Sequence, residues 1–503
     1  MATNESHTGD AQSGGRAHDL GHGRKQIFLN AFDMFTPTHM NFGQWKNPED
    51  KGDEKRDLAY WVELAQLLER GGFLSLFIAD TYGGYDTYEG GLDSCVSRAV
   101  QWPVMDPIVL VSAMAAVTKN LGFGVTGSTA GELPFLLARR YSTLDHLTKG
   151  RIAWNIVTSW KKAAFKAIGL DSPVEHDERY LQADDTSELT PALRRLWEGS
   201  WSSDALNHDS ENDSYTDASK VRDIKHRGKY FKLESKFIVD PSPQRTPFLF
   251  QAGASPAGIS FASQHAEGIF LGGFTPAATA PKVANIRAAA AEKGRDPWSI
   301  KFFSMVVPIV GVTDEEAQAK YAELKKYAST TGGLVFMSGL TGIDLSQVPL
   351  DQELKTSDST DANKIHSQLA SLTMDNETKW TPRMVAERAS LGGLAPLMIG
   401  SPSTVADEME RWMREADVDG FTFAQMTAPG TLVDIVELLV PELRNRGIYP
   451  DTNSKEDEGL SIRERVLGKG QKGLRDDHIG SAYKFDVYKE DPAYDQGAET
   501  EAS

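Results

Sequence analysis

The 503-residue sequence predicts an α/β fold, a (β/α)8 TIM barrel with insertions. Eight apolar, β-rich runs recur along the chain, and most are followed by a segment with apolar residues at helical spacing. The runs are almost continuously apolar, which is typical of parallel strands that are buried on both faces. Eight such strands alternating with helices are the number that closes this barrel.

The expected strands are 26–33, 74–80, 121–126, 151–158, 247–254, 268–273, 301–312 and 420–426. The expected helices are 58–70, 107–119, 135–147, 178–197, 260–266, 277–293, 315–327, 403–416 and 431–446. A small hairpin is expected to pair 228–233 with 237–240. The chain then divides into a disordered N-terminal tail (1–25), the barrel (26–450) with polar insertions near 200–240 and 331–381, and a polar C-terminal arm or tail (451–503).

Charge and cysteine content exclude several function classes. The net charge of -18 argues against nucleic acids and anionic membranes as partners, since both require basic patches. Cys95 is the only cysteine, so neither an intrachain disulfide nor a cysteine metal cluster is possible. No apolar run approaches the length of a membrane span, and residues 1–25 lack the apolar core of a secretory signal. We therefore expect a cytoplasmic protein.

One stretch suggests a different cofactor site. In LGFGVTGST, Gly122, Gly124 and Gly127 form the G-x-G-x-x-G pattern of a dinucleotide-binding loop. That loop must lead into a helix, whereas Val125 and Thr126 are β-branched and continue a strand, and 128–134 reads as a loop. The stretch is therefore interpreted as the third barrel strand.

Polar residues at the strand ends point to the site, because function gathers at the C-terminal ends of barrel strands. These residues are Asp33, Asp80, Thr126, Asn155, Thr158, Ser255, Gly272, Gly273 and Gln425. Each residue also has a simpler explanation, because polar residues commonly end buried strands where the chain enters a solvent-exposed loop. The set lacks paired carboxylates and histidine clusters, which disfavours hydrolysis and predicts no metal site. Hydroxyl, amide and backbone groups suit an organic cofactor that carries its own reactivity.

Four stretches together resemble the bacterial-luciferase-like flavin monooxygenases, in the branch of nitrilotriacetate monooxygenase and dibenzothiophene-sulfone monooxygenase. They are 67–81 (LLERGGFLSLFIADT), 138–159 (ARRYSTLDHLTKGRIAWNIVTS), 176–180 (HDERY) and 243–270 (PQRTPFLFQAGASPAGISFASQHAEGIF). The resemblance implies a luciferase-like barrel that forms a homodimer or tetramer. It also implies reduced FMN, supplied by a separate NAD(P)H:flavin reductase, with O2 as co-substrate. A small organic substrate would then be oxygenated through a C4a-peroxyflavin.

The resemblance also carries over five cofactor-binding residues. Asp80 and Thr126 match positions near the isoalloxazine, His176 and Tyr180 match a pair that lines the cofactor, and Ser255 matches a serine that holds the phosphate. The alternatives are a turn residue for His176, a packed helix residue for Tyr180 and a plain helix cap for Ser255. No catalytic residue beyond the flavin is identified.

The substrate pocket is less defined. The branch often has His-Pro-Tyr where this chain has Leu133, Pro134 and Phe135, which indicates a less polar or differently placed substrate. Segments 35–45 and 331–381 are expected to form a lid and pocket, with His39 and Trp45 as candidate substrate contacts. The sequence does not identify the substrate. Two alternative functions stay open: a non-catalytic flavin-binding barrel and a deazaflavin-dependent oxidoreductase.

Overall fold

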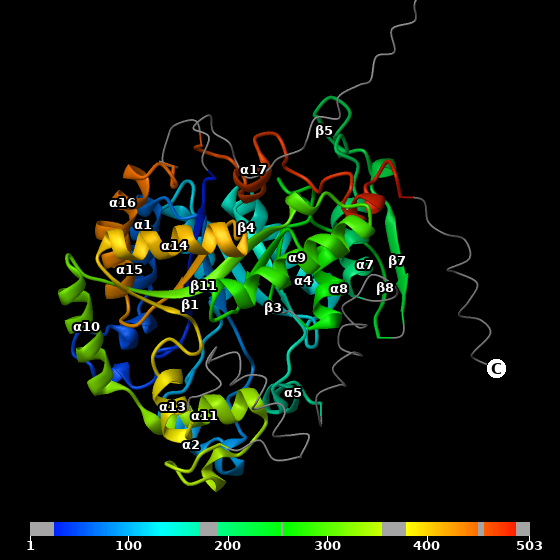
Figure 1. The fold of residues 1–503 in the computed structure, drawn as a ribbon. Helices are drawn as coiled ribbons and strands as arrows, with labels where there is room; N and C mark the ends of the chain where they lie inside the picture. The colour runs from blue at the N-terminus through cyan, green and yellow to red at the C-terminus, as the bar shows by residue number, and fades with distance from the viewer. Residues whose placement is uncertain are drawn as a thin grey trace, which may run out of the picture.

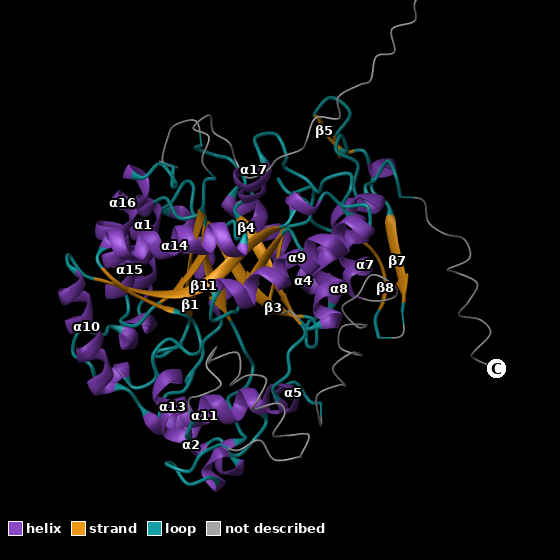
Figure 2. Ribbon diagram, viewed as in Figure 1, coloured by secondary structure: helices purple, strands orange, loops and turns teal. Residues whose placement is uncertain are grey.

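The computed structural model describes residues 25–170, 189–228, 230–252, 255–354, 379–450 and 457–488. Eight parallel strands pair in the order β1-β2-β3-β4-β9-β10-β11-β13 and back to β1, so the sheet closes into a barrel. Figure 2 shows the strands at the centre with helices around them. The predicted (β/α)8 barrel is confirmed.

The barrel strands are β1 (Phe28–Met34), β2 (Ser75–Ala79), β3 (Gly122–Ser128), β4 (Ile152–Val157), β9 (Phe248–Ala252), β10 (Gly268–Leu271), β11 (Lys301–Val310) and β13 (Gly420–Ala424). The helices that return between them are α1 (Leu58–Gly71), α3 (Val111–Ala116), α4 (Pro134–Thr148), α7 (Leu189–Arg194), α8 (Pro256–His265), α9 (Pro276–Glu292), α10 (Asp314–Tyr327), α14 (Pro402–Ala416), α15 (Gly430–Asp434) and α16 (Val440–Asn445). Two π-helical turns, η5 (Arg195–Gly199) and η9 (Ile435–Leu439), interrupt the expected long helices after α7 and α15. A 3-10 turn, η4 (Pro107–Leu110), begins the helix expected over 107–119.

Side-chain alternation along the strands fills the barrel with phenylalanines. Four rings stack across the interior: Phe32 on Phe77 (4.7 Å between centroids), Phe77 on Phe270 (4.2 Å) and Phe270 on Phe250 (4.6 Å). The alternate residues of the strands point outward to the helices, as in a packed barrel without a pore. This column forms the floor beneath the C-terminal ends of the strands.

The three glycines of the G-x-G-x-x-G pattern lie within or at the start of β3 and serve packing. A Cβ atom at Gly127 would lie 2.7 Å from Nε1 of Trp154, and one at Gly122 would lie 2.8 Å from the carbonyl oxygen of Leu74. Gly124 faces the Phe250 ring at 3.4 Å. The interpretation of this stretch as the third barrel strand is confirmed, since β3 pairs with β2 and β4.

A small lobe covers the C-terminal end of the barrel. It contains α2 (Asp93–Ser97), α11 (Thr330–Thr341) and α13 (Pro382–Ala389), which lie together at the bottom of Figure 1, with α5 (Lys162–Ala167) beside them. Its own core includes Tyr85, Cys95, Phe336 and Val385. The Gly- and Thr-rich composition of 331–381 gave no sign of the apolar helix α11; residues 355–378 lie outside the described part of the chain.

The structure differs from the expected topology in three details. The hairpin expected between 228–233 and 237–240 is wrong: β7 (Asp223–Arg227) pairs with β8 (Lys232–Lys236), because Gly228 sits in the turn and Phe237 is buried in the main core. A second hairpin joins β5 (Leu206–Asp209) to β6 (Ser214–Thr216). A ninth strand, β12 (Leu397–Gly400), was not expected; it pairs with the end of β11, outside the closed barrel.

Short 3-10 turns join several of these elements. They are η1 (Gln44–Lys46), η2 (Gly52–Arg56), η3 (Tyr88–Gly90), η6 (Ala218–Lys220), η7 (Pro297–Ser299), η8 (Leu345–Gln347) and η10 (Ile479–Tyr483).

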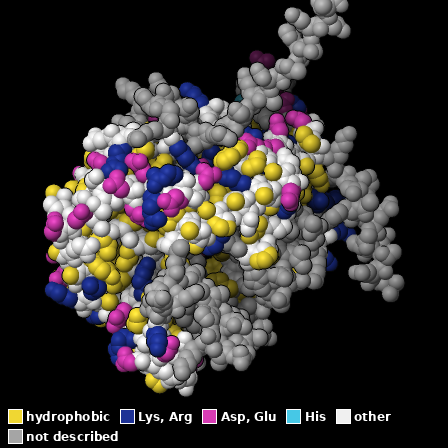
Figure 3. Space-filling model, in the orientation of Figure 1, with side chains coloured by type: hydrophobic (Ala, Val, Ile, Leu, Met, Phe, Trp, Pro, Cys, Tyr) yellow, Lys and Arg dark blue, Asp and Glu magenta, His cyan; other side chains and the backbone are white. Residues whose placement is uncertain are grey.

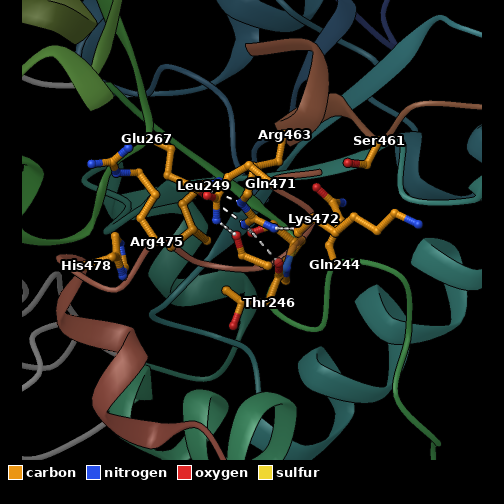
Figure 4. Close-up of polar contacts among 12 residues, drawn as sticks. Gln244, Thr246, Leu249, Glu267, Ser461, Arg463, Gln471, Lys472, Arg475 and His478 are labelled. Carbon is orange, nitrogen blue, oxygen red and sulfur yellow. Dashed lines mark hydrogen bonds and ion pairs between the residues drawn. The ribbon is translucent and has the colours of Figure 1, made fainter. Parts of the chain in front are cut away.

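Residues 457–488 form an arm across the opposite, N-terminal end of the barrel. Its helix α17 (Ile462–Leu467) lies at the top of Figure 1, and Ile462 packs into the phenylalanine core. Figure 4 shows Arg463 directed at Glu267, with Nε–Oε1 and Nη2–Oε2 distances of 2.7 and 2.8 Å. Arg463 also donates to the carbonyls of Thr246 and Lys472. The arm therefore closes the end of the barrel that lies away from the lobe.

Candidate active site

A cavity of about 630 Å³ lies between the C-terminal ends of the strands and the lobe. The walls are mostly apolar, and a few polar groups converge on them, as in small-molecule sites. The lining residues come from β1, β2, β4, β9 and β11, from four loops and from α5, α8 and α11: Phe32, Met34, His39, Met40, Ala79, Asp80, Thr81, Tyr85, Gln101, Ile156, Val157, Thr158, Ser159, Trp160, Lys161, Ala164, Gln251, Ala252, Phe261, Met305, Phe336 and Leu340.

Asp80 follows β2 directly and lines this cavity. The backbone N–H of Thr81 donates to its Oδ1 atom at 2.8 Å. Burial raises the pKa of Asp80 to about 6, and the negative charges of Asp106 and Glu132 act in the same direction. A carboxyl with such a pKa in a cavity is a frequent feature of functional sites.

His39 and Gln101 are held in the loops that cover the cavity. Gln101 Nε2 donates to the carbonyl of His39 at 3.0 Å, and the hydroxyl of Tyr85 donates to Gln101 Oε1 at 2.9 Å. The His39 ring packs edge-on against Phe32, with 4.4 Å between centroids. Burial, with the positive charges of Lys55 and Lys161, lowers the pKa of His39 to about 3, so the imidazole is neutral at neutral pH.

Thr126 faces the barrel interior, one layer above Gly124, but does not line the cavity. Asn155 Nδ2 donates to its hydroxyl at 2.9 Å. The Oδ1 atom of Asn155 and the Oε1 atom of Gln251 are buried and accept no hydrogen bond from the described residues. Buried acceptors of this kind normally have a hydrogen-bond partner. The C-terminal ends of β4 and β9 could therefore accept a hydrogen bond from a bound molecule.

Ser255 is the N-cap of α8, and its hydroxyl accepts from the Gly258 N–H at 3.1 Å. Pro256 at the first helical position is typical of a helix start. The N-terminus of α8 therefore has the polarity that favours an anion. His176 and Tyr180 lie outside the described residues.

Several predicted contacts lie elsewhere. Trp45 is 46% exposed and does not line the cavity. Leu133 is exposed at the start of α4, and Phe135 packs against Phe237, with 5.8 Å between ring centroids. The Leu-Pro-Phe departure therefore does not change the described cavity.

Sequence reasoning found His39 among the loop residues of the cavity but missed Lys161 and Gln101. Lys161 lies four residues after β4, next to the exposed Lys162, and a Lys-Lys pair usually indicates a solvated surface. Gln101 lies in a loop after α2 and adopts a left-handed conformation (φ 51°). Neither has a local signal, because the lobe that brings them to the cavity is assembled from distant segments.

Comparison with known proteins identifies the family. A profile described as luciferase-like monooxygenase matches residues 38–420. Dimethyl-sulfide monooxygenase of Hyphomicrobium sulfonivorans is 43% identical over 92% of this chain and 95% of that protein. Long-chain alkane monooxygenase of Geobacillus thermodenitrificans (strain NG80-2) is 45% identical over 92% of this chain and 98% of its own.

Solved structures agree with the sequence comparison. A crystal structure of long-chain alkane monooxygenase is 43% identical, with a TM-score of 0.82 over 92% of this chain and 100% of that one. A crystal structure of riboflavin lyase with modified FMN and riboflavin has a TM-score of 0.81 at 33% identity, over 92% of this chain and 100% of that one. The resemblance deduced from the sequence is thereby confirmed, and the chain belongs to the luciferase-like monooxygenase family.

Proposed function

We propose that the protein is a reduced-FMN-dependent monooxygenase of a two-component system. Reduced FMN would come from a separate NAD(P)H:flavin reductase, and O2 would be the co-substrate for oxygenation of a small organic molecule. The observation that carries this proposal is the cavity of about 630 Å³ at the C-terminal strand ends of a luciferase-like barrel.

The residues around the cavity fit a flavin. A flavin ring has apolar faces and a polar edge that both donates and accepts hydrogen bonds. Phe32, Met305 and Phe336 provide apolar walls, and the buried acceptor Gln251 Oε1 can take a hydrogen bond from the flavin edge. We assign Asp80 to the flavin ring because it lines the cavity, and Thr126 on the strength of the family resemblance.

The phosphate of FMN would bind at the N-terminus of α8. Ser255 supplies a hydroxyl there, and the helix end supplies a positive dipole. We assign His176 and Tyr180 to the same cofactor on the strength of the family resemblance.

Bound reduced FMN would supply the chemistry that activates dioxygen. The protein would orient the substrate and exclude water. Phe336 and Leu340 of α11 and Met40 of the facing loop place apolar surface over the strand ends. His39, being neutral, can donate or accept a single hydrogen bond without adding a charge.

Location and assembly are part of the proposal. No helix in the described segments has the length and apolarity needed to cross a membrane, and acidic and basic side chains are interspersed on the face shown in Figure 3. We place the protein in the cytoplasm, as a homodimer or tetramer. The exposed side chains of Leu133, the N-cap of α4, and of Leu136 and Leu147 on α4 provide apolar surface for such contacts. Sedimentation velocity would test the assembly.

Anaerobic titration with reduced FMN, followed by exposure to O2, tests the function. We expect saturable binding, tighter than that of riboflavin, which lacks the phosphate. Ser255→Ala should weaken FMN binding but not riboflavin binding. Ser401→Ala is the matched control, because Ser401 is also a Ser-Pro N-cap, at the start of α14.

Each outcome has a distinct meaning. Binding followed by O2-dependent oxygenation of any small organic molecule in a substrate panel supports the monooxygenase. Binding without any oxygenation across a substrate panel favours the non-catalytic flavin protein. Failure to bind reduced FMN, together with binding of a reduced deazaflavin, favours the deazaflavin-dependent oxidoreductase.

A further inference from the structure

Lys161 is a buried cation at the wall of the active-site cavity. Only 9% of its surface is exposed to solvent, and it lines the cavity together with Tyr85 and Trp160. Its Nζ atom lies 3.8 Å from the centroid of the Tyr85 ring and 5.9 Å from that of Trp160. Among the described residues, no carboxylate or carbonyl accepts a hydrogen bond from it or forms an ion pair with it.

A cation in this position needs a partner. Removing an ammonium group from water is costly unless it is paired, and a ring face replaces only part of its hydration. The Tyr85 ring is fixed, because its hydroxyl donates to Gln101 and its edge packs against Phe336 at 5.5 Å between centroids. The ammonium keeps further donors that the described residues do not use.

The charge of Lys161 acts across the cavity. It lowers the pKa of His39 and opposes the rise in the pKa of Asp80, so it is close enough to both to influence their ionisation. Burial in turn lowers the pKa of Lys161 to about 8, which leaves it mostly protonated at neutral pH. Among the described residues that line the cavity, Asp80 is the only one with a carboxylate, and it forms no ion pair with Lys161.

We propose that the substrate carries an anionic group, a carboxylate, sulfinate or sulfonate, which binds Lys161 beside the Tyr85 ring. This inference rests on the proposed function and specifies its substrate class. The apolar walls formed by Phe336, Leu340 and Met40 would hold the rest of the molecule. Lys161 is thus a specificity-determining residue that favours anionic substrates over neutral alkanes or sulfides.

Binding of matched six-carbon probes to the FMN-loaded protein tests the proposal. Isothermal titration calorimetry compares hexanoate and hexane-1-sulfonate with neutral 1-hexanol. Since a hydrogen bond to a charged group is worth about 10- to 100-fold in affinity, we expect wild type to bind both anions at least about tenfold more tightly than the alcohol.

Three variants locate the effect. Lys161→Met should lower the affinity for the anions by about 10- to 100-fold and leave that for 1-hexanol unchanged. Lys161→Arg should retain most of the preference. Lys162→Met is the matched control, because Lys162 is the adjacent lysine and is exposed; it should behave as wild type.

Three results would overturn the proposal. Wild type could bind 1-hexanol as tightly as the anions, or the Lys161→Met variant could keep the preference for anions. In the third result, the Lys161→Met variant binds FMN more weakly than wild type does but binds riboflavin equally well. The last result would make Lys161 a partner of the cofactor phosphate. Reduced FMN binding is titrated separately on each protein. Absence of the anion preference in wild type that binds FMN normally rejects the substrate class alone, whereas absence of FMN binding in wild type rejects the proposed function.

Discussion

The Nζ atom of Lys55 lies 2.5 Å from Oδ1 of Asp33, and their side chains are only 3% and 1% exposed. Asp33 is the penultimate residue of β1, and Lys55 belongs to η2. Gln425 donates to the other carboxylate oxygen of Asp33 at 2.8 Å. Because Met34, the next residue, lines the cavity, this ion pair fastens the η2 segment to the wall of the active site.

Removal of Lys55 should destabilise the protein strongly. We expect Lys55→Met to lower the free energy of unfolding by about 3–5 kcal/mol, because Asp33 would remain buried without its cation. Urea unfolding followed by circular dichroism measures the change. Lys51→Met is the control: Lys51 pairs with Glu54 at the surface, so its loss should cost less than about 1 kcal/mol. Equal losses in both variants would contradict a role for the buried pair.

The glycines of β3 should differ in their tolerance of alanine. Gly127→Ala should cost about 1–3 kcal/mol, because its Cβ atom would lie 2.7 Å from Nε1 of Trp154. Gly124→Ala meets Phe250 only at ordinary contact distance and should stay within about 1 kcal/mol of wild type. Thermal unfolding of both variants distinguishes a packing role from a phosphate-binding role. If the glycines formed a dinucleotide-binding loop, both substitutions would weaken cofactor binding, and neither would have to lower stability.

Asp80 should make stability depend on pH. An unperturbed aspartate has a pKa of 3.8, and burial raises that of Asp80 to about 6, so between these values the folded protein holds a proton that the unfolded chain has released. The stability that this proton contributes is complete below about pH 3.8 and is lost as the pH rises through 6. The Asn side chain of the Asp80→Asn variant is neutral at every pH. The Tm of this variant minus the Tm of wild type should therefore increase as the pH rises from 4 to 7.

The Asp80 experiment uses the protein without flavin and a series of buffers at constant ionic strength. Asp53→Asn changes an exposed carboxylate and provides the control. Its Tm difference from wild type should be flat across the same range. A flat difference for Asp80→Asn as well would show that the carboxyl is not perturbed.

Arg463 should hold the C-terminal arm on the barrel. Arg463→Gln should cost about 3–5 kcal/mol, since Glu267 would keep a buried, unpaired charge. The arm should also become sensitive to chymotrypsin around Tyr483, which gel electrophoresis of timed digests detects. Lys469→Gln, at an exposed position of the same arm, is expected to leave the digestion pattern unchanged. Retained protection in Arg463→Gln would place the anchoring elsewhere.

Local patterns in the sequence determined the barrel. Continuous apolar runs such as Leu74–Asp80 must be buried on both faces, and the helical segments between them supply the cover. Asp80 was found in the same way, because the residue that ends a barrel strand is placed at the active-site end by the strand itself. Ser255 was found from its position just past the fifth strand and from the family resemblance, and the structure makes it the N-cap of α8.

Tertiary structure alone decided the far wall of the cavity. Tyr85, Gln101, Lys161 and Phe336 come from different loops and helices, and only the packing of the lobe brings them together. Their side chains have no periodic pattern relative to the strands, so no local rule places them. Composition was misleading in the same region, where Gly- and Thr-rich residues form the buried helix α11. The sequence by itself thus determined the barrel and the strand-end residues through local periodicity, whereas long-range packing determined the lobe, the burial of Lys161 and hence the chemistry that the cavity offers a substrate.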